Sequence, residues 1–216
     1  MGNIRARSPE EKEVKRKEII KVVRRLMRRN NLEDISWNQI AKEAGMAKST
    51  MYVYWKTRED IFLGLFEDSY YRFLNILEKR IAAEVTTPVD LAEIYCAELV
   101  KDPLLLPLLE QLHPLIERHS NLQTLFDFKM RTYERIGGFV EIISKALSFS
   151  QQQAYQFLTF LFSQTLGLYQ MTNIPEGLAE LIRDTPASVF KLDFLQSLKE
   201  HMIIFARGLE VSRQLV

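Results

Sequence analysis

The stretch from Ser36 to Arg58 constrains the fold of this chain more than any other. Ser36 suits the N-cap position of a helix, because its hydroxyl accepts from an unpaired backbone N–H of the first turn. Apolar residues follow at helical spacing, and Gly45 then provides the positive φ that commonly ends a helix. A second short helix from about Ala47 to Trp55 completes a predicted helix-turn-helix. Its outer face gathers donors and aromatic rings, which suit phosphates and base edges in a major groove.

The charge distribution agrees with a nucleic-acid partner for this part of the chain. Residues 1–58 contain 15 Lys and Arg against 7 Asp and Glu, whereas the remainder contains 14 against 21, so the overall charge is only +1. A basic field of this kind steers a domain toward DNA and makes binding salt-sensitive. The alternative is a merely solvated basic surface. Arg5 and Arg7 lie in a segment without periodicity, which is either disordered or an arm for the minor groove.

The rest of the sequence predicts an all-α fold, because helical periodicity recurs throughout and no strand-like alternation stands out. We predict a DNA-binding helix-turn-helix domain over residues 1–57 and an effector-binding and dimerisation domain over residues 58–216, with a long helix from Arg58 joining the two. The predicted helices cover residues 9–29, 37–44, 47–55, 58–81, 88–101, 104–112, 121–147, 151–171 and 192–210.

Several classes of protein are disfavoured by what the sequence lacks. Its three histidines show no metal-ligand spacing, and there is no glycine-rich phosphate loop or nucleophile elbow, so we expect no enzyme, no metal and no cofactor. The one cysteine, Cys96, cannot form an internal disulfide, which favours a reducing cytoplasm. No apolar run reaches 18 residues, so we expect no membrane partner.

The residues of the helix-turn-helix resemble the DNA-binding signature of the TetR family of transcriptional repressors. The matching residues are Ile40-Ala41, Ala44-Gly45 and Tyr52-Val53-Tyr54-Trp55, followed by basic residues at Lys56 and Arg58. The chain departs from the family pattern at Ala47, Ser49 and Trp55, where Ser or Thr, Gly and Phe are usual. The resemblance implies contacts to double-stranded DNA from Asn38, Lys48, Ser49, Thr50, Tyr52, Val53, Tyr54, Lys56 and Arg58.

The same resemblance implies a homodimer on a palindromic operator, released by a small-molecule effector that we expect to be apolar or amphipathic. The candidate effector pocket comprises Tyr95, Cys96, Leu99, Leu109, His113, Phe126, Met130, Tyr133, Phe160 and Gln164, although such residues are more often plain core. The candidate dimer interface on the last two long helices comprises Phe157, Leu161, Thr165, Leu168, Phe194, Leu198, Met202, Phe205 and Leu209.

Two other interpretations remain open from sequence. One is a helical interaction protein that uses the basic domain for non-specific DNA or for protein partners, without an effector. The other, a helical enzyme, has little support. The sequence also leaves open whether the regulator represses or activates transcription, because the effect of binding depends on where the operator lies relative to the promoter.

Overall fold

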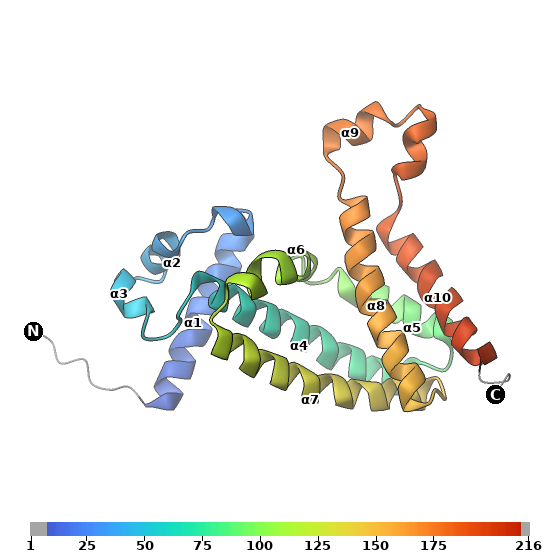
Figure 1. Cartoon of the computed structure of the whole chain (residues 1–216), viewed down its shortest axis with the longest axis horizontal. Helices are drawn as coiled ribbons and strands as arrows, with labels where there is room; N and C mark the ends of the chain where they lie inside the picture. The colour runs from blue at the N-terminus through green and yellow to red at the C-terminus, as the bar shows by residue number, and fades with distance from the viewer. Residues whose placement is uncertain (1–7, 213–216) are drawn as a thin grey trace, which may run out of the picture. The chain divides into compact units, whose positions relative to one another are not determined.

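The computed structural model describes residues 8–212, without the side chains of Glu176 and Ser212, so Arg5 and Arg7 lie outside the described residues. Within this range the protein is helical and has no strand, which confirms the predicted all-α class (Figure 1). The helices are α1 (Pro9–Met27), α2 (Trp37–Glu43), α3 (Lys48–Met51), α4 (Arg58–Glu84), α5 (Pro88–Leu99), α6 (Leu105–Glu110), α7 (Leu122–Ala146), α8 (Gln151–Thr172), α9 (Glu176–Leu181) and α10 (Phe194–Ser212). Short non-α turns are η1 (Leu32–Asp34), η2 (Leu112–Glu117) and η3 (Pro186–Phe190).

The chain forms two compact units. The first contains the described residues up to Tyr70 together with Pro107–Met130, and the second contains Tyr71–Leu106 with the described residues from Arg131 onward. Helices α4 and α7 each contribute residues to both units. The first unit thus includes a segment beyond residue 106, and the domain boundary predicted after residue 57 stays a prediction.

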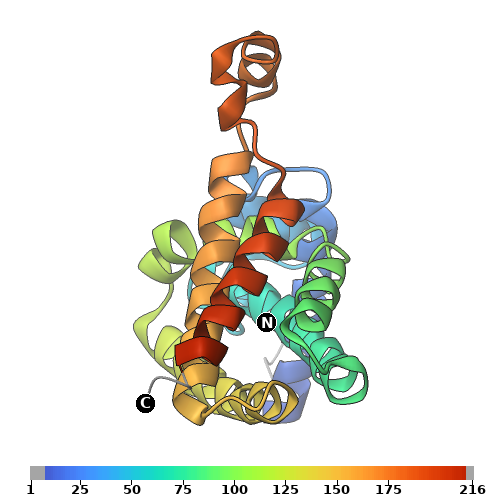
Figure 2. The same cartoon turned by 90° about the vertical axis from the view of Figure 1, so that its right-hand side faces the viewer.

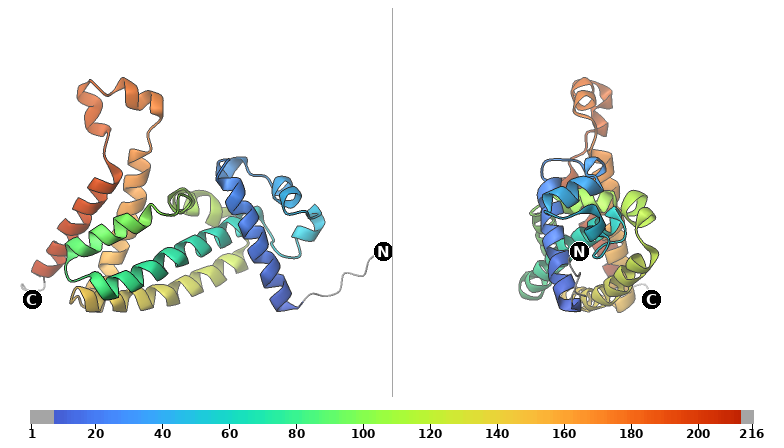
Figure 3. Two further views of the ribbon diagram at one scale, coloured as in Figure 1. Left: turned by 180° about the vertical axis from the view of Figure 1, so that it is seen from behind. Right: turned by 90° about the vertical axis from the view of Figure 1, so that its left-hand side faces the viewer.

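Helix α1 begins where the sequence predicts. Ser8 is its N-cap: the hydroxyl accepts from the Glu11 N–H at 3.2 Å, and the Glu11 carboxylate accepts from the Ser8 N–H at 3.2 Å. This reciprocal pair satisfies two of the N–H groups that a helix start leaves unpaired. The inner face of α1 buries Ile19 and Val23 against the other N-terminal helices, which lie beside it in Figure 3.

The turn between α2 and α3 is set by Gly45. This residue has a φ of +63°, a left-handed conformation that favours glycine. The Met46 N–H donates to the Ala41 carbonyl at 2.9 Å and the Gly45 N–H to the Lys42 carbonyl at 3.1 Å, the Schellman pattern of a helix end. Helix α3 is shorter than the predicted 47–55 and gives way to turns after Met51.

Trp55 fixes the end of this motif by packing against α1 and α4. A Cβ at Gly64 would lie 2.8 Å from Cη2 of Trp55, so only glycine allows the indole to approach α4 this closely. The Arg16 guanidinium lies 5.5 Å from the centre of the Trp55 ring, at cation–π distance. The segment after α3 is therefore held from both α1 and α4.

In the second unit, α10 packs against α5 and α8 (Figure 2). The Tyr95 and Thr165 hydroxyl oxygens are 3.0 Å apart in this core. Phe160 of α8 stacks on Phe205 of α10 with ring centres 3.9 Å apart and planes within 4°. The chain between α8 and α10 forms α9 and η3, which stand beyond the ends of both helices in Figures 1 and 2.

The segment after α6 continues further than predicted. Pro114 lacks an N–H, and the Ile116 N–H donates to the Gln111 carbonyl at 2.9 Å, so η2 is a widened π-type turn through Pro114. The sequence predicts that the helix ends earlier, at about residue 112. Among residues 8–212, no helix combines the length and hydropathy needed to cross a lipid bilayer.

Candidate nucleic-acid interface

Most of the predicted DNA contacts lie together at the surface around α3. Lys48 and Ser49 are exposed, Tyr52 is 48% exposed and Val53 is 45% exposed. Asn38 and Lys56 are exposed as well, and Thr50 is half-buried. The side chains of Lys48, Ser49 and Tyr52 make no hydrogen bond or ion pair with any described residue. Their donors are therefore available to an external acceptor.

Trp37 stacks on Tyr52 at this surface. The ring centres are 4.8 Å apart and the planes differ by 26°. Trp37 is the first residue of α2 and directly follows the N-cap Ser36, whose hydroxyl accepts from the Gln39 N–H at 3.2 Å. Sequence reasoning assigns Trp37 no role. Its position just after a helix cap is the one local signal that could have indicated it.

Two of the residues predicted to contact DNA make contacts inside the chain. Tyr54 is only 3% exposed, and its carbonyl accepts from the Arg16 Nε at 3.0 Å. Arg58 donates from Nη1 to the Ile35 carbonyl at 2.9 Å and from Nε to Glu59 at 2.8 Å. The geometry places Tyr54 in the core and gives Arg58 hydrogen bonds to the segment before α2, and a contact of either residue with DNA stays a prediction.

Asp60 holds the backbone of the segment that follows α3 by hydrogen bonds. Its side chain is 1% exposed, and Oδ2 accepts from the N–H groups of Lys56 at 3.2 Å and Thr57 at 2.9 Å. Oδ1 accepts from the Asn121 N–H at 2.8 Å, at the residue before α7 begins. The spacing of Thr57 and Asp60 predicts a helix start, but the bond to Asn121 joins positions 61 residues apart. No local pattern could have indicated it.

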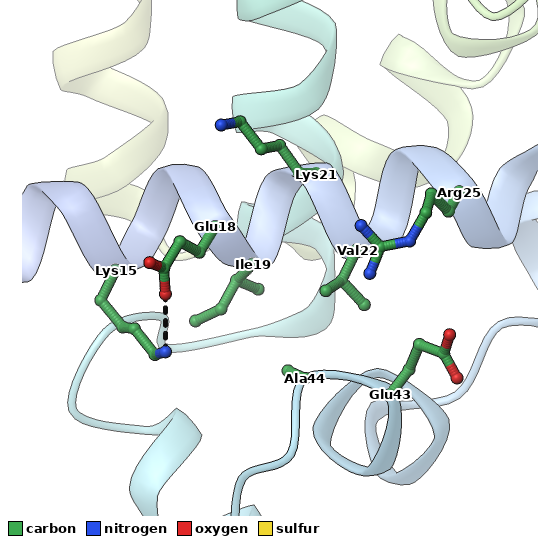
Figure 4. Close-up of a pocket in the computed structure, with 8 residues that line it drawn as sticks. All are labelled: Lys15, Glu18, Ile19, Lys21, Val22, Arg25, Glu43 and Ala44. Carbon is green, nitrogen blue, oxygen red and sulfur yellow. Dashed lines mark hydrogen bonds and ion pairs between the residues drawn. The ribbon is translucent and has the colours of Figure 1, made fainter.

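A pocket of about 290 Å³ lies beside α1 and the end of α2 (Figure 4). Its lining consists of three cationic, two carboxylate and three apolar side chains. Lys15 forms an ion pair with Glu18 at 2.6 Å. Ligand pockets are mostly apolar with few polar groups, so this lining is that of a solvated charged surface. The lining residues are Lys15, Glu18, Ile19, Lys21, Val22, Arg25, Glu43 and Ala44, and none of them is a predicted effector contact.

The ten predicted effector contacts are divided between the two units. Tyr95, Cys96, Leu99, Phe160, Gln164 and Tyr133 belong to the second unit, whereas Leu109, His113, Phe126 and Met130 belong to the first. Leu109 is buried, but Phe126, Met130 and Tyr133 are 58%, 46% and 75% exposed on α7. His113 is also exposed and lies 3.0 Å from Glu117.

Cys96 lies in a buried part of α5. Burial raises the pKa of its thiol to about 11, although nearby Lys199 acts in the opposite direction. The thiol is therefore protonated at neutral pH and behaves as a small apolar group. Gln164, on α8, is paired at 2.8 Å with the exposed His201 of α10.

Six of the nine predicted interface residues are already buried within the chain. They are Phe157, Leu161, Thr165, Leu168, Leu198 and Met202, each at most 5% exposed. Phe194, Phe205 and Leu209 are half-buried. A side chain without exposed area can lose none on dimerisation, so these six act as core of α8 and α10. The outward faces instead carry Tyr155, Met171, Ile204 and Val211, exposed by 60%, 60%, 69% and 57%.

Comparison with known protein families resolves the identity of both halves. Residues 19–65 match the model described as bacterial regulatory proteins, tetR family. Residues 67–213, more than half of the chain, match the model described as tetracyclin repressor-like, C-terminal domain. The chain belongs to the TetR family. Members are transcriptional regulators rather than enzymes, which agrees with the expectation from sequence.

Individual relatives support the same placement. The Fatty acid metabolism regulator protein of Bacillus subtilis (strain 168) is 32% identical over 82 residues, which are 38% of this TetR-family chain and 42% of that protein. The match thus spans less than half of the relative's length. Among solved structures, the fatty acid degradation regulator FadR from Bacillus halodurans aligns with a TM-score of 0.54 at 18% identity, covering 95% of this chain and 98% of that one.

A possible TetR family transcriptional regulator from Streptomyces coelicolor A3(2) aligns with a TM-score of 0.57 at 13% identity, covering 91% of this chain and 99% of that one. At these identities the two structural likenesses concern the fold.

The bracing role of Arg58 is testable by stability. Arg58→Ala removes donors to the carbonyls of Glu33 and Ile35 and leaves them short of partners, so we expect the free energy of unfolding to fall by about 1–3 kcal/mol. Lys56→Ala removes an exposed cation two residues away and is the matched control, with an expected change within about 0.5 kcal/mol. Urea unfolding followed by circular dichroism measures both. Equal stabilities for the two variants would contradict the bracing role.

Proposed function

We propose that this protein is a ligand-responsive transcriptional repressor that binds a palindromic DNA operator as a homodimer. The observation that carries this proposal is the exposed set of Lys48, Ser49 and Tyr52 on a helix-turn-helix, whose side chains make no hydrogen bond or ion pair within residues 8–212. Such a helix enters the major groove, where side-chain donors meet base edges and phosphates. Because the DNA of a bacterium lies in its cytoplasm, we propose that location too.

DNA binding is tested with a duplex that the wild-type chain enriches from a library of random duplexes. We expect Tyr52→Ala and Lys48→Ala each to weaken binding to this duplex about tenfold, and Lys48→Ala to reduce the salt slope by about one. Lys145→Ala removes an exposed cation from the last turn of α7 and should leave affinity and salt slope unchanged. Fluorescence anisotropy at several salt concentrations measures these values. If Tyr52→Ala and Lys48→Ala both bind like wild type, the interface is assigned wrongly.

The proposed dimer pairs the outward faces of α8 and α10 rather than the buried residues inferred from sequence. Ile204 and Val211 lie two turns apart on one face of α10, and both are more than half exposed. An apolar face of this kind suits a two-fold contact, in which the same patch occurs on both subunits. Two helix-turn-helix domains are needed because a palindrome presents two half-sites about one turn of DNA apart.

Ile204→Glu tests this interface. A carboxylate at the centre of an apolar contact would be desolvated without a partner, so we expect the dimer dissociation constant to rise at least tenfold. Ile76→Glu introduces the same charge on α4, at a side chain that is 44% exposed, and should leave the dimer intact. Sedimentation velocity over a concentration series compares the two. A dimer unaffected by Ile204→Glu would place the contact elsewhere.

Release by an effector needs only a ligand that prefers the conformation that does not bind DNA. The candidate effector contacts Leu99 and Phe160 are apolar, which supports an apolar or amphipathic ligand. The name of the Bacillus subtilis relative, a fatty acid metabolism regulator, supports an acyl chain.

We expect palmitate, or its thioester with coenzyme A, to weaken the complex with the enriched duplex by about 5-fold to 150-fold. Butyrate serves as the control, because its short chain buries little apolar surface. Anisotropy of the labelled duplex measures the release. If neither long-chain compound changes the affinity, the acyl effector is excluded while DNA binding itself still stands.

A further inference from the structure

We propose that Trp37 is a positioning residue that holds the Tyr52 ring in the orientation used for DNA recognition. This proposal rests on the proposed function, because it concerns how the same interface reads DNA. Trp37 itself lies outside the set of residues predicted to touch DNA. The geometry that points to it is the stacked pair formed by the first residue of α2 and the residue directly after α3.

Tyr52 receives little positional support from its own helix. Helix α3 has only four residues, its N-cap Ala47 makes no side-chain cap, and Tyr52 lies one residue beyond the last. Nearly half of the Tyr52 side chain is exposed, and within residues 8–212 its hydroxyl has no hydrogen-bond partner. An exposed tyrosine of this kind would be free to change rotamer, and ordering it on binding would reduce affinity.

Trp37 supports the Tyr52 ring from α2, a helix that is better anchored than α3. Helix α2 is capped by Ser36 and anchored by Ile40 and Ala41, which are 0% and 3% exposed. The indole lies 4.8 Å from the Tyr52 ring at an interplanar angle of 26°, within the range of favourable aromatic stacking. One face of the Tyr52 ring is therefore covered by α2. The residue as a whole remains 48% exposed, which leaves room for a contact with DNA.

The polar atom of Trp37 takes no part in this arrangement. Its Nε1 is buried and has no hydrogen-bond partner among the described residues. A buried donor without a partner is unfavourable, so the indole is explained by its ring area rather than by its N–H. The substitution Trp37→Phe keeps a ring for stacking and removes the unpaired donor. This conservative variant is therefore expected to preserve the pair.

The experiment measures binding to the duplex that wild type enriches from a random library, with a shuffled duplex of the same composition as reference. We expect Trp37→Ala and Trp37→Leu to weaken binding to the enriched duplex about threefold to tenfold and Trp37→Phe to bind like wild type. Binding to the shuffled duplex should change less than about twofold in every variant. Trp37→Leu keeps apolar volume without a ring, so it tests stacking even if Trp37→Ala fails to fold.

A double-mutant comparison separates positioning from a general structural role. If Trp37 acts through Tyr52, Trp37→Leu should have no further effect in a Tyr52→Ala background. A loss that is equal with and without Tyr52, or a loss that Trp37→Phe does not restore, would overturn the proposal. So would wild-type affinity in Trp37→Leu. If wild type enriches no duplex, the proposed function fails at that step, before any variant is compared, and the role of Trp37 fails with it.

Discussion

The first unit depends on the hydrogen bonds that the buried carboxylate of Asp60 accepts. A carboxylate taken out of water is costly unless hydrogen bonds compensate it, and here three backbone N–H groups do so, from Lys56, Thr57 and Asn121. Two of these N–H groups belong to the segment after α3, and the third belongs to the residue before α7. Both segments must be in place together for the carboxylate to be satisfied. A displacement of the start of α7 would therefore disturb the hydrogen bond between Asp60 and Lys56, which lies within the same compact unit.

The features that the sequence predicts well are those decided within a few residues. Ser8, Ser36, Thr87 and Ser150 each cap a helix by accepting from the N–H three residues later, so residues within one turn of the helix are enough to identify them. Gly45 reaches positive φ for an equally local reason. The all-α class and the order of the long helices follow from these starts and stops together with helical periodicity.

The features that sequence reasoning misses are decided by partners far along the chain. Periodicity shows that a helix face is apolar but not what covers it, so it suggests an interface at Phe157 and Met202, although both are fully buried within the chain. The aromatic Phe126 and Tyr133 suggest pocket lining but lie on the exposed side of α7. Likewise, the charge of Arg58 suggests a contact with DNA but does not reveal the hydrogen bonds that its guanidinium donates to the Ile35 carbonyl and the Glu59 carboxylate.

The environment of Cys96 has a consequence for the kind of signal this regulator can receive. The chain has a single cysteine, it is buried on α5, and its pKa is raised to about 11. Oxidants and electrophiles react with the thiolate, and that form is scarce at neutral pH when the pKa lies so high. Cys96 is therefore poorly suited to sensing oxidative stress, and changes in cellular redox state should leave this regulator's thiol unmodified.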